Sequence, residues 1–307
     1  MLTYVILYKT RGGVIQMKKI FDYKAEWSGI KNRMAQMFDS ESGRTVLLAV
    51  DHGYFQGAPA GLENLRKTIE PLLPFCNAVS PTIGGLKSSF NPWMKTPIIL
   101  RATGGNSMRR PAELDDEIVT TSVQEMLNLN AIGFTTSCYI GLPHQKQTIG
   151  NLTSLTTEAH KYGLISIGIT AVGSDPVLGK FVKGEREDGG ELSAEDKKEA
   201  IKYLKHSCRV VSENGADIVK TYYCDGFEEV VEACLAPIVI AGGTKKPTKE
   251  ALEFTYNAVK AGAIGVDMGR NIFQNEKPVA MIQAIRAIVH GNKTAVQAMD
   301  LYNSIKG

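Results

Sequence analysis

The sequence predicts an α/β fold, a (β/α)8 barrel, and three features of its pattern support this. Short apolar runs bounded by turn residues recur eight times between residues 44 and 270. Helical patterns separate these runs, and several of them close with a glycine just before the next run: Gly133, Gly163, Gly215 and Gly262. Such glycines are typical of helix ends that lead into a strand. Eight such units in 307 residues fit one barrel.

The apolar runs are the expected strands. They cover residues 44–51, 78–82, 97–104, 131–141, 164–170, 216–223, 237–243 and 263–270. The expected helices between them cover residues 63–73, 115–129, 152–162, 194–214 and 249–261. A doubly wound sheet is the alternative architecture. It is disfavoured because no Gly-x-Gly-x-x-Gly turn follows the first strand.

The first 43 residues are expected to form an N-terminal extension, and residues 44–307 the catalytic barrel. The start of the chain is apolar but short, without a basic region or a cleavage site, which argues against a signal peptide. Met17 precedes two lysines and is an alternative start, which would make the first 16 residues an appendage to the native protein.

The composition excludes several classes of protein. A hydrophobic content of 43% and a charged content of 22% are those of an ordinary globular protein with ample core. The net charge of +3 is too small to indicate nucleic acid or a membrane surface, and no apolar run approaches a membrane span. The five cysteines form no Cys-x-x-Cys pair, which favours a reducing cytoplasm. The five histidines show no metal-binding spacing.

One of the buried strands carries a lysine in its middle. Alternation in the strand at 216–223 places Ile218, Lys220 and Tyr222 on one face. A buried unpaired ammonium group is costly, but desolvation lowers the pKa of a lysine, and a neutral amine can attack a carbonyl to form a Schiff base. A lysine that reaches the strand end or pairs with a carboxylate explains the residue equally well.

The C-terminal ends of barrel strands carry the chemistry in this fold. These ends are polar in the present sequence: Asp51, His52, Arg101, Tyr139, Thr170, Lys220 and residues 267–270. The loop over residues 173–193 is long enough to be a lid, although a solvated excursion or a subunit contact would explain it equally well.

Two glycine-rich turns favour a phosphate site. Gly242 and Gly243 follow the seventh strand, and Gly269 and Arg270 follow the eighth. Glycines let backbone N–H groups approach an anion, and arginine offers a forked donor to phosphate oxygens. Barrels often bind phosphate between these two loops. Tight turns alone are the other explanation for the glycines.

Together these motifs resemble the archaeal-type class I aldolase superfamily, most closely its branch of autoinducer-2 thiolases. The matching segments are residues 48–57, 217–223, 240–243 and 265–274, within a similarity that runs from residue 43 to the C-terminus. The resemblance implies a cytoplasmic acyltransferase with Lys220 at the Schiff-base position and no metal or permanently bound cofactor. Its implied substrate is 3-hydroxy-5-phosphonooxypentane-2,4-dione, whose acetyl group passes to coenzyme A as co-substrate and leaves dihydroxyacetone phosphate. It also implies a homo-oligomer, often decameric.

The sequence departs from the aldolases of this superfamily at one position. Their fifth strand ends in a tyrosine that acts as general acid, and Thr170 takes the matching place here. Threonine is a poor proton donor compared with tyrosine, which favours the thiolase branch. Tyr139 is a substitute donor, so a class I aldolase acting on a sugar phosphate such as fructose 1,6-bisphosphate remains an alternative. A non-catalytic phosphosugar-binding barrel is a second.

A thiolase can use a cysteine nucleophile, and Cys138 and Cys224 lie near the expected barrel mouth. Cysteine is more often a small buried hydrophobe, and neither residue neighbours a histidine, so direct attack by the coenzyme A thiol is favoured. His52 beside Asp51 is the candidate base, although a role in closing the turn after the first strand fits it equally well. The expected catalytic residues are thus Lys220, Asp51, His52, Tyr139 and Thr170, with Gly242, Gly243, Gly269 and Arg270 binding phosphate.

Overall fold

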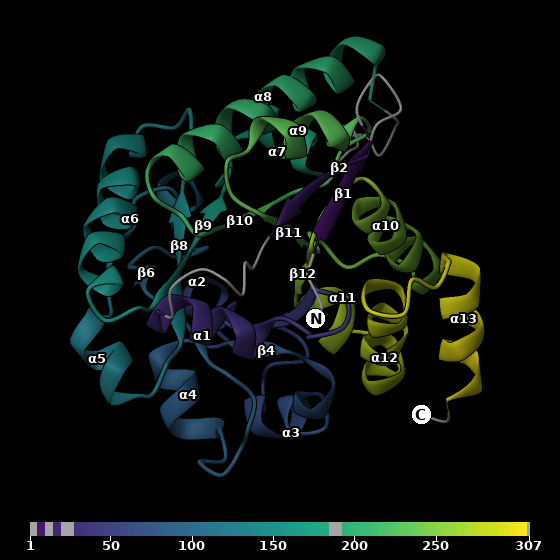
Figure 1. Ribbon diagram of the computed structural model, residues 1–307. Coiled ribbons are helices and arrows are strands. Elements are labelled where there is room, and N and C mark those ends of the chain that lie inside the picture. Colours follow the sequence, from purple (N-terminus) through teal and green to yellow (C-terminus); the bar gives the residue numbers. More distant parts are fainter. Residues whose placement is uncertain (1–4, 10–14, 20–27, 184–191, 306–307) are drawn as a thin grey trace.

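Eight parallel strands form a barrel surrounded by helices in the computed structural model, which describes residues 5–9, 15–19, 28–183 and 192–305 (Figure 1). In sheet order the strands are β4-β3-β12-β11-β10-β9-β8-β5. Their bounds are β3 (Thr45–Ala49), β4 (Ala78–Ser80), β5 (Ile99–Arg101), β8 (Gly133–Cys138), β9 (Ile165–Thr170), β10 (Ile218–Thr221), β11 (Ile238–Ala241) and β12 (Gly265–Met268). Each lies within its expected range, which confirms the (β/α)8 barrel.

The barrel closes between β4 and β5. A parallel bridge joins Val79 to Ile98 there, and the Val79 N–H donates to the carbonyl of Pro97 at 3.0 Å. Further up, the Arg101 N–H donates to the carbonyl of Pro81 at 2.9 Å. The seam therefore places the end of β5, with Arg101, at the barrel mouth beside β4.

Helices cover the outside of the barrel (Figure 1). They are α3 (Leu65–Ile69), α4 (Ile83–Ser89), α5 (Val123–Asn128), α6 (Gln145–His160), α7 (Pro176–Lys183), α8 (Ala194–Glu213), α9 (Phe227–Ala233), α10 (Thr248–Lys260), α12 (Pro278–Val289) and α13 (Ala295–Ser304). The short helices α2 (Gly53–Gln56) and α11 (Arg270–Phe273) follow β3 and β12 at the C-terminal end of the barrel. β1 (Val5–Lys9) and β2 (Ile15–Lys19) form a separate antiparallel pair. No helix among the residues described is long and apolar enough to cross a membrane.

The expected helix over residues 115–129 is wrong in its first half. Only α5 (Val123–Asn128) is helical, and Ile118–Val119 form the short strand β7, which pairs with β6 (Thr103–Gly104). Residues 118–121 are all β-branched, and such side chains favour an extended backbone over a helix. The Ser122 hydroxyl then caps α5 by accepting from the Glu125 N–H. The β6–β7 hairpin therefore fixes the orientation of Glu117, the residue directly before β7.

A helix within the expected N-terminal extension closes the lower end of the barrel. In α1 (Gly29–Met37), Met37 is fully buried, and it clusters with inward-facing residues at the start of the strands, among them Ile165 and Ile218. The Thr45 hydroxyl donates to the Met37 carbonyl at 2.7 Å. The helix therefore plugs the barrel from below, while the division at residue 43 remains a prediction.

Replacing the plug residue should destabilise the barrel. We expect Met37→Ala to lower the free energy of unfolding by about 2–5 kcal/mol, because the cavity it leaves lies in a fully packed region. Gln36→Ala, one position away on the exposed face, should change it by no more than about 0.5 kcal/mol. Urea unfolding followed by circular dichroism measures both. Equal midpoints for the two variants would show that α1 does not stabilise the barrel.

Candidate active site

A cavity of about 440 Å³ opens at the C-terminal ends of the strands. This is the end at which barrel enzymes hold their active sites. Polar side chains from five strands and their loops line it: Asp51, His52, Tyr54, Arg101, Ser137, Tyr139, Lys220, Tyr222, Asp267 and Arg270. Apolar side chains, among them Phe55, Leu114 and Val172, form part of its wall.

Lys220 lies in this cavity and pairs with a buried carboxylate. Its Nζ is 2.9 Å from Oδ2 of Asp267, which comes from β12, two strands away in the sheet. The Asp267 side chain is fully buried, and burial raises its pKa, an effect that the Lys220 ammonium partly offsets. A carboxylate with a raised pKa can take the proton of the lysine and leave a neutral amine. Lys220 is also the only lysine among the described residues of the eight barrel strands.

Asp51 and His52 follow β3 and lie close together at the cavity. His52 Nδ1 is 3.8 Å from Asp51 Oδ1, and both residues line the cavity. Burial lowers the pKa of His52 to about 4, which leaves the imidazole uncharged near neutral pH and makes it a weaker proton acceptor than a free histidine. The ring also packs edge-on against Phe273, at 5.5 Å between centroids. His52 therefore packs in the cavity wall, and its role as a base stays a prediction.

The residues expected to bind phosphate come together on one side of the cavity, where Gly242, Gly243, Gly269 and Arg270 all line it. Asn271 ties the two loops to each other. Its side-chain amide donates to the Gly242 carbonyl at 2.7 Å, and its Oδ1 accepts from the Lys246 N–H at 2.8 Å. The Nε of Arg270 is buried and has no hydrogen-bond partner among the described residues. Glycine backbone and a free guanidinium N–H suit a phosphate.

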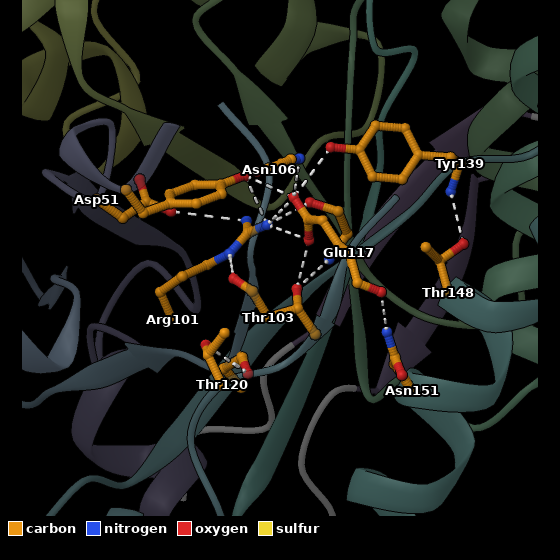
Figure 2. A network of polar contacts seen from close by, with 12 residues as sticks. Asp51, Arg101, Thr103, Asn106, Glu117, Thr120, Tyr139, Thr148 and Asn151 are labelled. Atoms are coloured by element: carbon orange, nitrogen blue, oxygen red, sulfur yellow. Dashed lines mark hydrogen bonds and ion pairs between the residues drawn. The ribbon is translucent and has the colours of Figure 1, made fainter. Parts of the chain in front are cut away.

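Glu117 is the centre of a buried polar network at the opposite wall (Figure 2). This carboxylate is fully buried, and the Nη2 of Arg101 donates to its two oxygens at 2.8 and 2.6 Å. Four other side chains donate to it at 2.6–3.1 Å: Thr103, Tyr54, Tyr139 and Asn106. The hydroxyl of Tyr139, expected as a substitute proton donor, is thus already bonded to Glu117.

The sequence did not single out Glu117, because the segment from residue 115 was expected to be helical. The run of β-branched residues immediately after it was the available signal for an extended backbone. The partner of Glu117, Arg101, was recognised only as one of several polar strand ends.

The expectation for Thr170 is wrong in its geometry. Ile167 and Ile169 of β9 face the barrel interior, so Thr170 faces outward, where its hydroxyl bonds that of Thr221 at 2.7 Å. Thr170 is buried and does not line the cavity, so it cannot touch a molecule bound there. The cavity-facing residues at the end of β9 are Ile169 and Ala171. The end of β9 therefore supplies no proton donor to the cavity. The reason is that its cavity-facing residues are apolar, and not that a threonine stands in the place of a tyrosine.

Neither candidate cysteine lines the cavity. The Sγ of Cys138 points away from it, toward the Thr148 carbonyl at 3.9 Å, and burial raises the pKa of Cys138 to about 12. Burial likewise raises the pKa of Cys224 to about 12. Neither thiol is therefore poised as a nucleophile. Within the described ranges, no group of three or more His, Cys, Asp or Glu side chains could hold a metal ion.

The long loop after β9 begins at the cavity. Gly173 and Ser174 line it, and α7 follows. The central part of the loop expected as a lid, residues 184–191, lies outside the described residues.

Comparison with known proteins gives consistent matches. Residues 45–275 match the DeoC/LacD family of aldolases. The 3-hydroxy-5-phosphonooxypentane-2,4-dione thiolase of Photorhabdus laumondii is 40% identical over 296 residues, which are 95% of this chain and 94% of that protein. The protein of the same name from Escherichia coli K12 is 40% identical over 282 residues, 92% of this chain and 89% of that protein.

A curated protein called an uncharacterized aldolase, from Pasteurella multocida, is 41% identical over 278 residues, 90% of this chain and 88% of its own length. Among solved structures, an archaeal fructose 1,6-bisphosphate aldolase superposes with a TM-score of 0.68 at 22% identity. The match covers 85% of this chain and 99% of that one. At this identity the likeness shows a shared fold.

The Glu117 network should be essential for stability. We expect Glu117→Ala to lower the free energy of unfolding by about 3–5 kcal/mol, because it leaves the Arg101 guanidinium buried without the carboxylate that is hydrogen-bonded to it. The control is Glu113→Ala, which removes an exposed ion pair with Arg110 and should cost no more than about 1 kcal/mol. Thermal and urea unfolding compare the two. A similar small loss in both would mean that the buried pair is not needed for the fold.

Proposed function

The chain belongs to the DeoC/LacD family of aldolases, and on that premise we propose that it transfers the acetyl group of 3-hydroxy-5-phosphonooxypentane-2,4-dione to coenzyme A. The products are acetyl-coenzyme A and dihydroxyacetone phosphate. The observation that carries the proposal is Lys220, a lysine inside a cavity-facing strand with its Nζ 2.9 Å from the buried Asp267. Relatives that are 40% identical over nine-tenths of the chain carry this substrate in their names, which supports the choice of substrate.

The first step is Schiff-base formation. Asp267 takes the ammonium proton of Lys220, and the neutral amine attacks the C4 carbonyl of the diketone, next to the carbon that carries phosphate. Loss of water leaves an iminium ion at C4. The pair is suited to this step because it lies in a cavity wall where only part of the lysine, 12% of its side chain, reaches solvent.

The phosphate is held beside the lysine. The two glycine turns with Arg270 follow β11 and β12, and β11 pairs directly with β10, which carries Lys220. In the substrate, the phosphate ester and the C4 carbonyl are also close together, because a single carbon separates them. Binding of the phosphate at Gly242, Gly243, Gly269 and Arg270 therefore presents C4 to the amine.

Carbon–carbon cleavage follows attack by the thiol. The coenzyme A sulfur bonds to the C2 carbonyl carbon, and its proton passes to the Asp51–His52 pair. When the C2–C3 bond breaks, its electron pair moves into the iminium and forms an enamine on Lys220. C3 then takes back the proton held by the Asp51–His52 pair, and water hydrolyses the imine to release dihydroxyacetone phosphate. Coenzyme A enters as a co-substrate, so no permanently bound cofactor is needed.

The cavity is less suited to aldol cleavage. That reaction needs a group to manage the proton of the hydroxyl at the bond being broken. Ile169 and Ala171 supply none, and the Tyr139 hydroxyl is already bonded to Glu117, which leaves the Asp51–His52 pair that we assign to the thiol proton. We therefore expect slow cleavage of fructose 1,6-bisphosphate. The expected homo-oligomer and the cytoplasmic location remain predictions.

Two linked assays test the function. The protein should convert the diketone to dihydroxyacetone phosphate and acetyl-coenzyme A only when coenzyme A is present. Borohydride added with dihydroxyacetone phosphate should attach mass to the peptide that contains Lys220. We expect Lys220→Arg, which keeps a positive charge beside Asp267, to lose both the adduct and the turnover, whereas Lys95→Ala at an exposed position should lose neither. Efficient cleavage of fructose 1,6-bisphosphate without coenzyme A would favour an aldolase instead.

Arg270 should affect binding of the phosphate more than catalysis. We expect Arg270→Ala to raise KM for the phosphorylated diketone by about ten- to a hundredfold, the value of a charge-assisted hydrogen bond. A dephosphorylated analogue should show little change, and steady-state kinetics with both compounds measures the difference. Equal losses for the two substrates would assign Arg270 a structural role.

A further inference from the structure

The side chain of Arg101 is held rigidly at the cavity wall. It is 4% exposed and lines the cavity. Its Nε donates to the Thr103 carbonyl at 2.8 Å. Its Nη2, which carries two hydrogens, lies 2.6–2.8 Å from four acceptor oxygens, on Glu117, Tyr54 and Ser137. The guanidinium also stacks over the Tyr54 ring, 4.3 Å from its centroid. Two of its three nitrogens are therefore fully committed to the protein.

The third nitrogen, Nη1, is not committed. In the described part of the chain no hydrogen bond engages it, and Asp51 Oδ2 lies 3.7 Å away, beyond hydrogen-bond length. Figure 2 shows Asp51 and Glu117 on opposite sides of the guanidinium. Asp51 and Arg101 both line the cavity, so the N–H donors of Nη1 face it. A substrate oxygen there can form the hydrogen bond that Asp51 Oδ2 is too distant to form.

Arg101 lies across the barrel mouth from the phosphate site. In the closed ring of eight strands, β5 is four strands from β11 in either direction, and β10 with Lys220 is next to β11. A substrate with its phosphate at the β11 and β12 turns and its C4 at Lys220 directs its acetyl end toward the far wall. Arg101 is on that wall.

We propose that Arg101 is a catalytic residue whose Nη1 binds the oxygen of the acetyl carbonyl and stabilises the negative charge that forms there. This inference rests on the proposed acetyl transfer. As the thiol sulfur bonds to C2, the carbonyl electron pair moves to the oxygen, which accepts the Nη1 hydrogen bonds. When the carbonyl re-forms, the C2–C3 pair moves into the iminium on Lys220. Fixed donors aimed at developing charge are worth more than mobile ones.

The surrounding charges suit this role. Glu117 balances the guanidinium charge in the resting protein, so Arg101 can be buried without a substrate. Asp51 would repel an oxyanion, but it is also placed to receive the thiol proton, directly or through His52. Protonation of Asp51 removes its charge at the moment when the oxygen becomes negative. Glu117 acts only through Arg101 and is a positioning residue.

The test separates acetyl transfer from Schiff-base chemistry. In D₂O, dihydroxyacetone phosphate exchanges a hydroxymethyl hydrogen through the enamine on Lys220, a reaction that forms no oxyanion at C2. We expect Arg101→Lys, which lacks the rigid fork, to lower kcat for acetyl transfer by about 10²–10³-fold. Its KM, its hydrogen exchange and its borohydride adduct should change only a fewfold. Arg286→Lys, outside the cavity and bonded to the Phe75 carbonyl, is the matched control and should change none of them.

A second variant tests the proposal if Arg101→Lys does not fold. Arg101→Gln combined with Glu117→Gln leaves neither charge buried alone, and it should show the same selective loss of transfer. Equal losses of transfer and exchange in a folded variant would overturn the proposal and make Arg101 structural. Unchanged transfer would overturn it as well. Wild-type protein that exchanges hydrogen but transfers no acetyl group would refute the proposed function itself, a result visible before any variant is made.

Discussion

The buried ion pair between Arg101 and Glu117 is the interaction on which one wall of the cavity depends. Removing two charges from water is costly, and only a full set of hydrogen bonds compensates for it. Here donors from α2, from the β6–β7 hairpin and from Tyr139, just after β8, meet the carboxylate, while Ser137 accepts from the guanidinium. Elements far apart in the chain are thereby held in one arrangement at the mouth.

The second buried pair, Lys220 and Asp267, is built differently, and its chemistry follows from that. Among the described residues, Asp267 has no partner other than Lys220, and the pair borders the cavity. A carboxylate surrounded by donors, like Glu117, is fixed in place by its hydrogen bonds. One with a single partner can exchange a proton with it at a smaller cost. The first pair therefore suits a fixed electrostatic role and the second suits proton transfer.

Close backbone packing at Gly269 links the turn after β12 to the turn after β3, which carries Asp51 and His52. A Cβ atom there would lie 2.4 Å from the Ala49 carbonyl oxygen and 2.5 Å from Cε1 of His52, so only glycine lets β12 and the turn after β3 approach this closely. The same contact keeps the imidazole of His52 buried, which lowers its pKa to about 4 and leaves it neutral. The steric demand of one glycine thus sets how closely the turn after β12 approaches the His52 ring in the cavity wall.

The sequence by itself determined the barrel, its eight strands, the buried Lys220 and the gathering of Gly242, Gly243, Gly269 and Arg270, because all of these follow from local periodicity and from strand order. Only the tertiary structure decided which way Thr170 faces, since a shift of one residue in a strand moves a side chain to the other face. It also decided the partners of Lys220 and Arg101. Asp267 lies 47 positions from Lys220 in the sequence, and Glu117 lies in a segment whose pattern was misread as helical. Closure of the barrel brings the ends of distant strands together and so forms these pairs. No local pattern in the sequence indicates them.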